Sequence, residues 1–256
     1  MTEYWFMLPV SLVIASVATG SGFGGGILLF PIFVHLLDMS IPEAVGTGMV
    51  TELCGMTSAM VSYTRQKQVE FEIAFPLIII SFPGLITGLY IVQVVNPVYP
   101  KLFFGVVVIL CALWMLFSLR DKTINTNSNL VVEEIVPFCW IPFFGGISSG
   151  VTSIGTAETL MPVLERLLKI EIHRAIATTV VVEGAVGWLA TSINIWEGQI
   201  RWDVGLYTMT GVILGGRIGP LLSKLISHRF LKLVFSFFVI LAGLQMIFLS
   251  IGEVLG

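Results

Sequence analysis

The chain has 256 residues, of which 56% are hydrophobic and only 11% are charged. A soluble domain carries about 25% charged residues, and this chain has too few to cover the surface of a soluble fold. The composition excludes a large soluble enzyme domain, a nucleic-acid-binding module and a disordered chain. The formal net charge of -3 says little about partners, because almost every charge lies in a short loop. A mean hydropathy of +0.96 predicts an all-α integral membrane protein.

The first half of the chain begins with an apolar stretch at 4–37 that glycines interrupt between 20 and 26. The interruption leaves two arms, at about 5–18 and 26–37. An arm of 12–15 residues rises only about 18–23 Å as a helix, which is too short for a bilayer core of about 30 Å. Three apolar segments of full length follow, and they predict transmembrane helices at about 43–64, 71–95 and 101–119.

The second half repeats this order after a polar linker at 120–131. A second apolar stretch, at 132–168, is broken around four glycines, Gly145, Gly146, Gly150 and Gly155, into arms at about 133–147 and 156–168. Full-length segments then predict helices at about 171–193, 203–224 and 231–250. The linker divides the chain into two predicted membrane repeats, 1–119 and 132–256.

The two halves match each other without gaps when Gly24 is aligned with Gly155 and every other position follows at the same offset, which we call the repeat offset. Positions 20–117 contain 23 identities over 98 positions, and rare residue types are among them. The matched pairs also include Pro31 with Pro162, Thr47 with Thr178, and Glu52 with Glu183. The match indicates an internal duplication, which is a hallmark of secondary transporters.

The loop charges decide how the repeats are oriented, because Lys and Arg concentrate in cytoplasmic loops. If both glycine-broken stretches cross the bilayer once, the basic residues divide five against seven. If each stretch is a re-entrant hairpin, each half crosses three times and the second half is inverted. Ten basic residues then lie on one side, and only Lys101 and Arg201 lie on the other.

We therefore predict two inverted-topology repeats, each a re-entrant hairpin plus three transmembrane helices. A model in which both arms of each stretch cross fully gives the same parity. In either case both termini lie outside the cell, and the chain is a multi-pass protein of the plasma membrane.

Two re-entrant hairpins that enter from opposite faces would bring their tips together near the midplane. Each tip ends at the N-terminus of a short helix, where unpaired N–H groups and a partial positive charge favour anions. Glycines let the backbone approach a ligand closely. Close helix packing is the alternative role for glycines in membrane segments. The predicted substrate-binding residues are Ser21, Gly22, Gly24, Gly25, Gly26, Thr47, Thr51, Ser153, Gly155, Thr156, Thr178 and Thr179.

Glu52 and Glu183 lie near the centres of their predicted helices, and Glu158 lies in the first turn of the second hairpin's short helix. Intramembrane carboxyl groups are costly and usually functional, so we predict that they carry protons. A hydrogen-bonded glutamic acid that only joins helices is the alternative. Arg217 is the one basic residue away from the ends of a predicted span, and it could be a counter-ion or could extend to the membrane edge.

Catalytic and metal chemistry lack the expected patterns. Cys54, Cys111 and Cys139 all lie in apolar segments, and no metal-spaced Cys or His cluster appears. No nucleophile–base set is recognisable either. We expect no enzyme activity, no cofactor and no metal site.

Two motifs resemble a known family. The run GSGFGGGILLFP (20–31) with AVGTG (44–48) resembles the TauE/SafE family of sulfite exporters, as does GISSGVTSIGTAETLMP (146–162) with AIATT (175–179). The second motif reads GTAE where the family usually has a glycine cluster. The resemblance covers essentially the whole chain and implies a permease that exports sulfite, organosulfonates or related small anions.

The sequence thus predicts a secondary transporter for a small sulfur-containing anion, bound between the hairpin tips and acting either as a proton-linked carrier or as a uniporter. A channel that uses the same tips as a filter is the alternative, and a membrane scaffold is a third class. The expected partners are the small anion and the lipid bilayer, with no nucleic acid, and a homodimer is compatible with the sequence.

Overall fold

The computed structural model describes residues 4–21, 24–65, 67–118, 136–164, 168–226 and 228–255, which form helices and no strand. The helices of the first half are α1 (Met7–Ser21), α2 (Gly26–Pro31), the π-helix η1 (Ile32–Leu36), α3 (Ile41–Arg65), α4 (Phe71–Val94) and α5 (Val98–Ser118). Those of the second half are the 3-10 helix η3 (Val136–Phe138), α6 (Trp140–Thr152), α7 (Thr156–Pro162), α8 (Ile172–Trp196), α9 (Trp202–Leu225) and α10 (His228–Leu255).

Six long helices lie where full-length segments were predicted. Four of them are long and apolar enough to cross a membrane over the described residues, namely Phe71–Val94, Val98–Phe117, Arg174–Trp196 and Leu233–Glu253. The other two, α3 and α9, have 25 and 24 residues but are less apolar. In α3 the polar residues include Thr47, Thr51 and Glu52, which face the interior of the bundle. The fold is that of an all-helical membrane protein.

Both glycine-broken stretches consist of short helices. In the first, α1 has 15 residues, and α2 and η1 have six and five. In the second, α6 has 13 residues and α7 has seven. Each arm is shorter than the roughly 20 residues that a crossing needs. Pro31 lacks the N–H that a regular helix would use, and the chain changes from α-helix to π-helix directly after it.

The second break is narrower than predicted. Gly145, Gly146 and Gly150 lie inside α6, and only residues 153–155 separate it from α7. A Cβ at Gly146 or Gly150 would overlap backbone oxygens of α4. These glycines therefore allow two helices to pack closely, and the predicted arm boundary at 147 is wrong for this reason.

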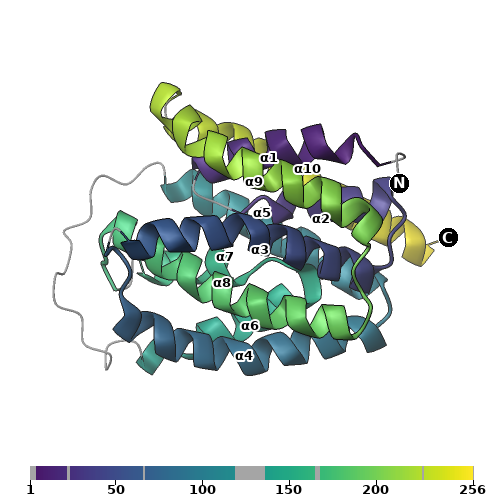
Figure 1. Cartoon of the computed structure of the whole chain (residues 1–256). Coiled ribbons are helices and arrows are strands. Elements are labelled where there is room, and N and C mark those ends of the chain that lie inside the picture. Colours follow the sequence, from purple (N-terminus) through teal and green to yellow (C-terminus); the bar gives the residue numbers. More distant parts are fainter. Residues whose placement is uncertain are drawn as a thin grey trace.

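The helices of the two halves correspond at the repeat offset that aligns the sequences. The helices α3 and α8 begin at 41 and 172, and α4 and α9 begin at 71 and 202, so both pairs keep that offset. Helix α1 packs along α9, whereas α6 packs along α4, which is the same pairing with the halves exchanged. Helix α3 packs against α8, and α5 packs against α10. Figure 1 shows α1 beside α9 and α3 beside α8.

Reciprocal contacts join the halves at the atomic level. The backbone N–H of Arg201 donates to Thr47 Oγ1 at 3.0 Å, and the backbone N–H of Glu70 donates to Thr178 Oγ1 at 3.1 Å. The repeat offset relates both residues of one bond to both residues of the other. Each half therefore supplies a hydroxyl acceptor to a backbone N–H just before a long helix of the other half.

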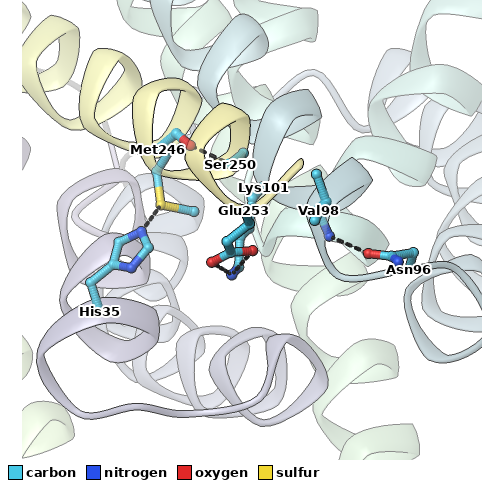
Figure 2. Close-up of polar contacts among 7 residues, drawn as sticks. All are labelled: His35, Asn96, Val98, Lys101, Met246, Ser250 and Glu253. Atoms are coloured by element: carbon cyan, nitrogen blue, oxygen red, sulfur yellow. Dashed lines mark hydrogen bonds and ion pairs between the residues drawn. The ribbon is translucent and has the colours of Figure 1, made fainter. Parts of the chain in front are cut away.

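Polar contacts link several helices at the end of the bundle where both chain ends lie (Figure 1). Lys101 Nζ lies 2.7 Å from Glu253 Oε1 and joins the start of α5 to the end of α10 (Figure 2). His35 Nε2 of η1 lies 2.9 Å from Met246 Sδ of α10. The broken first stretch is thereby attached to the last helix of the chain.

Aromatic rings fill the interior near the first break. Phe30 stacks on Phe104 with ring centroids 4.6 Å apart, and Phe33 and Phe235 are fully buried in the same core. Many large apolar side chains instead face outward, and examples are Phe75, Tyr90, Leu110 and Phe237. An apolar exterior on long helices is the surface that a lipid environment requires.

Candidate functional site

The first break is closed by a carboxyl group from α3. A Cβ at Gly24 would overlap Glu52 Oε1, and a Cβ at Gly26 would lie 2.9 Å from Glu52 Oε2. Only glycine leaves room for the carboxyl group at these two positions. The backbone N–H of Gly26, the first residue of α2, donates a hydrogen bond to the Glu52 carboxyl group. The Glu52 carboxyl thus lies against the start of α2.

The second break repeats this arrangement with a carboxyl group from α8. The backbone N–H of Ala157, in the first turn of α7, donates a hydrogen bond to the Glu183 carboxyl group. Ala157 and Glu183 are the repeat counterparts of Gly26 and Glu52. Glu183 is 7% exposed, and its Oε2 has no hydrogen-bond partner among the described residues.

The second break also has a cap of its own, which the first lacks in the described residues. Gly155 has a φ of 145°, a conformation that favours glycine, and its N–H donates to Glu158 Oε2 at 2.9 Å. The backbone N–H of Thr156 donates to Ser149 Oγ at 3.0 Å, and the two hydroxyl oxygens lie 2.7 Å apart. These bonds fix α7 to the end of α6.

A cavity of about 280 Å³ lies beside the two carboxyl groups. Its polar lining comes from Glu52, Glu183, Thr19, Thr51, Thr179 and Tyr63, and its backbone lining includes the first break. No Lys, Arg or His is among the described residues that line it. The residues that line the cavity are Ala15, Thr19, Gly24, Gly25, Gly26, Leu29, Thr51, Glu52, Gly55, Met56, Tyr63, Ala157, Met161, Ile176, Thr179, Val180, Glu183, Val212, Ile213 and Gly216.

A second cavity of about 10 Å³ lies on the other side of Glu52 and Glu183. It has room for about one water molecule. Ser153, which is 2% exposed, lines it, and the Ser153 hydroxyl has no hydrogen-bond partner among the described residues. Met49, Leu53 and the α8 residues 186–187 complete much of the wall.

The structure brings seven of the predicted site residues to the large cavity, which are Gly24, Gly25, Gly26, Thr51, Glu52, Thr179 and Glu183. Ser153 lines the small cavity. Three further predicted residues, Gly155, Thr156 and Glu158, hold α7 in place behind the cavity. Thr47 and Thr178 lie away from it and bond to the opposite half. Gly22 and the side chain of Ser21 lie outside the described residues.

Several lining residues had not been predicted. Gly55, Met56 and Tyr63 lie three, four and eleven residues after Glu52, so they share its face of α3. That helical spacing was the signal available in the sequence. Arg217 has an exposed side chain on α9 and does not line the cavity, although Gly216 does.

Metal coordination has no support at this site. Among the residues that the structure describes, no group of three or more His, Cys, Asp or Glu side chains could hold a metal ion.

The chain matches a known protein family over almost its whole length. A model of the family described as "Sulfite exporter TauE/SafE" matches residues 7–246. The chain is 21% identical over 267 residues to the probable membrane transporter protein YunE of Bacillus subtilis, and the match covers 96% of this chain and 98% of that protein.

Two other relatives carry similar descriptions. The probable membrane transporter protein MJ0441 of Methanocaldococcus jannaschii is 24% identical over 264 residues, with 96% of this chain and 97% of the relative covered. A probable membrane transporter protein of Haemophilus influenzae is 23% identical over 198 residues, with 77% and 76% covered. No solved structure matches the chain.

Proposed function

Because the chain belongs to the sulfite exporter TauE/SafE family of membrane transporters, we propose that it exports a small sulfur-containing anion such as sulfite or an organosulfonate. The observation that carries the proposal is the cavity of about 280 Å³ between the glycine break and the paired glutamates. Pockets for drug-sized ligands usually measure about 300–1,000 Å³, so this cavity suits a small solute.

We further propose that the two halves are inverted in the bilayer. The reciprocal bonds of Thr47 and Thr178 support a two-fold relation between the halves. Each half has three long helices that would each cross the membrane once. If the broken stretch of each half enters and leaves on the same side, it adds no crossing, so each half crosses an odd number of times. A two-fold axis then lies in the membrane plane, as in other inverted-repeat transporters. The chain ends lie outside, where Lys101 and Arg201 are both paired with acidic residues.

Proton coupling follows from the charges at the cavity. An anion that binds beside ionised Glu52 and Glu183 is repelled by both, and the described cavity lining offers no basic side chain to offset them. Binding of the anion is favoured when one or both carboxyl groups carry a proton. Export of the anion is therefore coupled to movement of at least one proton in this proposal.

A flux measurement in proteoliposomes tests the function. Purified protein is reconstituted, and uptake and release of labelled sulfite, sulfate, thiosulfate and methanesulfonate are followed with and without a pH gradient. We expect flux of at least one sulfur anion, stimulated by the gradient. Failure of every one of these anions to move would refute the proposed substrate class.

The variants Glu52→Gln and Glu183→Gln test the coupling. Glutamine keeps the size and a hydrogen-bond acceptor but cannot exchange a proton, so we expect flux that no longer responds to the pH gradient. Glu72→Gln changes an exposed acidic residue of α4 and is the matched control. An unaltered pH response in both cavity variants would refute the coupling role.

A channel is the second candidate, since the small cavity extends beyond the glutamates. Counterflow separates the two, because a carrier accumulates labelled anion against its own gradient when unlabelled anion flows the other way. We expect counterflow, and its absence in the presence of rapid flux would favour the channel.

A further inference from the structure

The two cavities are related by the internal repeat. Val180, which lines the large cavity, is the repeat counterpart of Met49, which lines the small one. Gly55 and Met56 of the large cavity are likewise the counterparts of residues 186 and 187 of the small one. Glu52 and Glu183 exchange and belong to both cavities. Five of the nine residues around the small cavity are thus counterparts of residues around the large one.

The cavities also point to opposite ends of the bundle. The large one contains Tyr63 and Ile176, which lie near the end of α3 and the start of α8. The small one contains Met49 and Val186, which lie toward the start of α3 and the end of α8. Since α3 and α8 pack against each other, the pair of glutamates separates two routes along them.

Equivalent positions in the two routes are packed differently. A Cβ at Gly48 of α3 would lie 2.7 Å from Ser153 Oγ and 3.2 Å from Ser153 Cβ, so α3 touches the end of α6 there. The counterpart of Gly48 is Thr179, which lines the large cavity and whose hydroxyl group has no hydrogen-bond partner among the described residues. One repeat position is closed in the first half and open in the second.

A second contact seals the same route. A Cβ at Gly46 would lie 2.6 Å from the carbonyl oxygen of Gln199 and 3.1 Å from Asn194 Oδ1. Asn194 is 2% exposed, whereas its counterpart Tyr63 lines the open cavity. The closed route is therefore held by contacts of α3 with α6 and with the end of α8.

We propose that the small cavity is the collapsed form of a second entrance to the same anion site, opened when α3 separates from Ser153 and Asn194. In that state Gly48, Met49 and Val186 line a route to the end of the bundle that carries the chain termini, and the large cavity closes. The inference rests on the proposed transport function, and it identifies the contact between Gly48 and Ser153 as the gate.

A reversible cross-link tests the gate directly. The double variant Gly48→Cys with Ser153→Cys, made without the three native cysteines, places the two Cβ atoms close to the roughly 3.5–4.5 Å of a disulfide. We expect oxidation to reduce anion flux about tenfold or more and a reducing agent to restore it. Each single variant is the control, since neither can form this bond. Undiminished flux from fully cross-linked protein would overturn the proposal.

Cysteine accessibility provides a second test that does not need the cross-link. Met49→Cys and Val180→Cys are repeat counterparts, and a membrane-impermeant thiol reagent is applied from each side of oriented vesicles. We expect Val180→Cys to react from one side and Met49→Cys from the other, the latter only during transport. A Met49→Cys variant that transports but never reacts would overturn the second entrance.

The two proposals fail in distinguishable ways. If no sulfur anion moves, yet the accessibility of the counterpart cysteines alternates with another solute, the substrate is wrong and the entrance stands. If sulfite moves and the cross-link has no effect, the substrate stands and the entrance is wrong.

Discussion

At both breaks a glutamate from a long helix lies against the start of a short helix, but the two breaks differ in the hydrogen bonds that hold their backbone in place. At the first, Gly24 and Gly26 lie against the Glu52 carboxyl and line the large cavity. At the second, Glu158 and Ser149 bond the backbone directly, and the large cavity is reached by Ala157 and Met161 of α7 but by none of residues 153–155. The difference shows that the first break borders the large cavity, where the proposed substrate would bind, whereas the second break is held in place by hydrogen bonds to its own backbone.

Gly155→Ala should have the largest effect of these variants, and that effect should be a loss of folding stability. Alanine at a φ of 145° is strained by about 1–3 kcal/mol, and its Cβ would overlap the Ser148 side chain, which adds about 1–3 kcal/mol. We expect a large fall in the thermal midpoint of the purified protein. Gly252→Ala, with nothing near its Cβ, is the control. A variant as stable as the parent would show that the second break is not braced.

Gly24→Ala should impair transport more than stability. The added Cβ would displace the Glu52 carboxyl from its place beside α2. We expect a roughly tenfold loss of flux, which corresponds to about 1.4 kcal/mol in the transport barrier, with a smaller change in the thermal midpoint because the Glu52 side chain can move without unfolding the bundle. Gly216→Ala also lies on the cavity but has open space at its Cβ, so its flux should stay near that of the parent. Equal flux in the two variants would show that transport does not depend on the close approach of Gly24 to the Glu52 carboxyl.

Ser149→Ala sharpens the comparison by removing one brace. The backbone N–H of buried Thr156 would lose its acceptor, at a cost of about 1–3 kcal/mol. We expect a lower thermal midpoint, measured in detergent, with the apparent affinity for the anion unchanged. A selective loss of anion affinity would instead assign Ser149 to the binding site.

Thr47→Val and Thr178→Val should have the smallest effects, and they should be equal. Each removes one hydroxyl acceptor from a backbone N–H at the start of a long helix, which costs about 1 kcal/mol. The two thermal midpoints should fall together, and the double variant should fall by their sum. A clear difference between the single variants would show that the halves are not equally dependent on each other.

The long helices could be predicted from the sequence to within a few residues, because about 20 apolar residues in a row leave little choice in a bilayer. The repeat also paired Glu52 with Glu183, and both line the cavity. The role of Gly146 and Gly150 could not be predicted, since a glycine that shortens a helix–helix distance has the same sequence pattern as one that breaks a helix.

Thr47 and Thr178 illustrate the other limit of sequence reasoning. Their position about one turn before a buried glutamate favoured substrate binding, whereas their hydroxyl groups accept from backbone groups 154 and 108 residues away. Local spacing identifies the face of a helix, but it does not reveal which distant segment packs on that face.

The bond from Arg201 to Thr47 has a consequence for how the protein is made. A ribosome adds about 5–20 residues per second, so the acceptor on α3 emerges roughly 8–30 s before its donor, which lies 154 residues further along. During that interval the first half of the chain lacks the hydrogen bond between Arg201 and Thr47. Membrane insertion of the early helices therefore cannot depend on the completed pairing, and the final locking of the halves belongs to the last stage of synthesis.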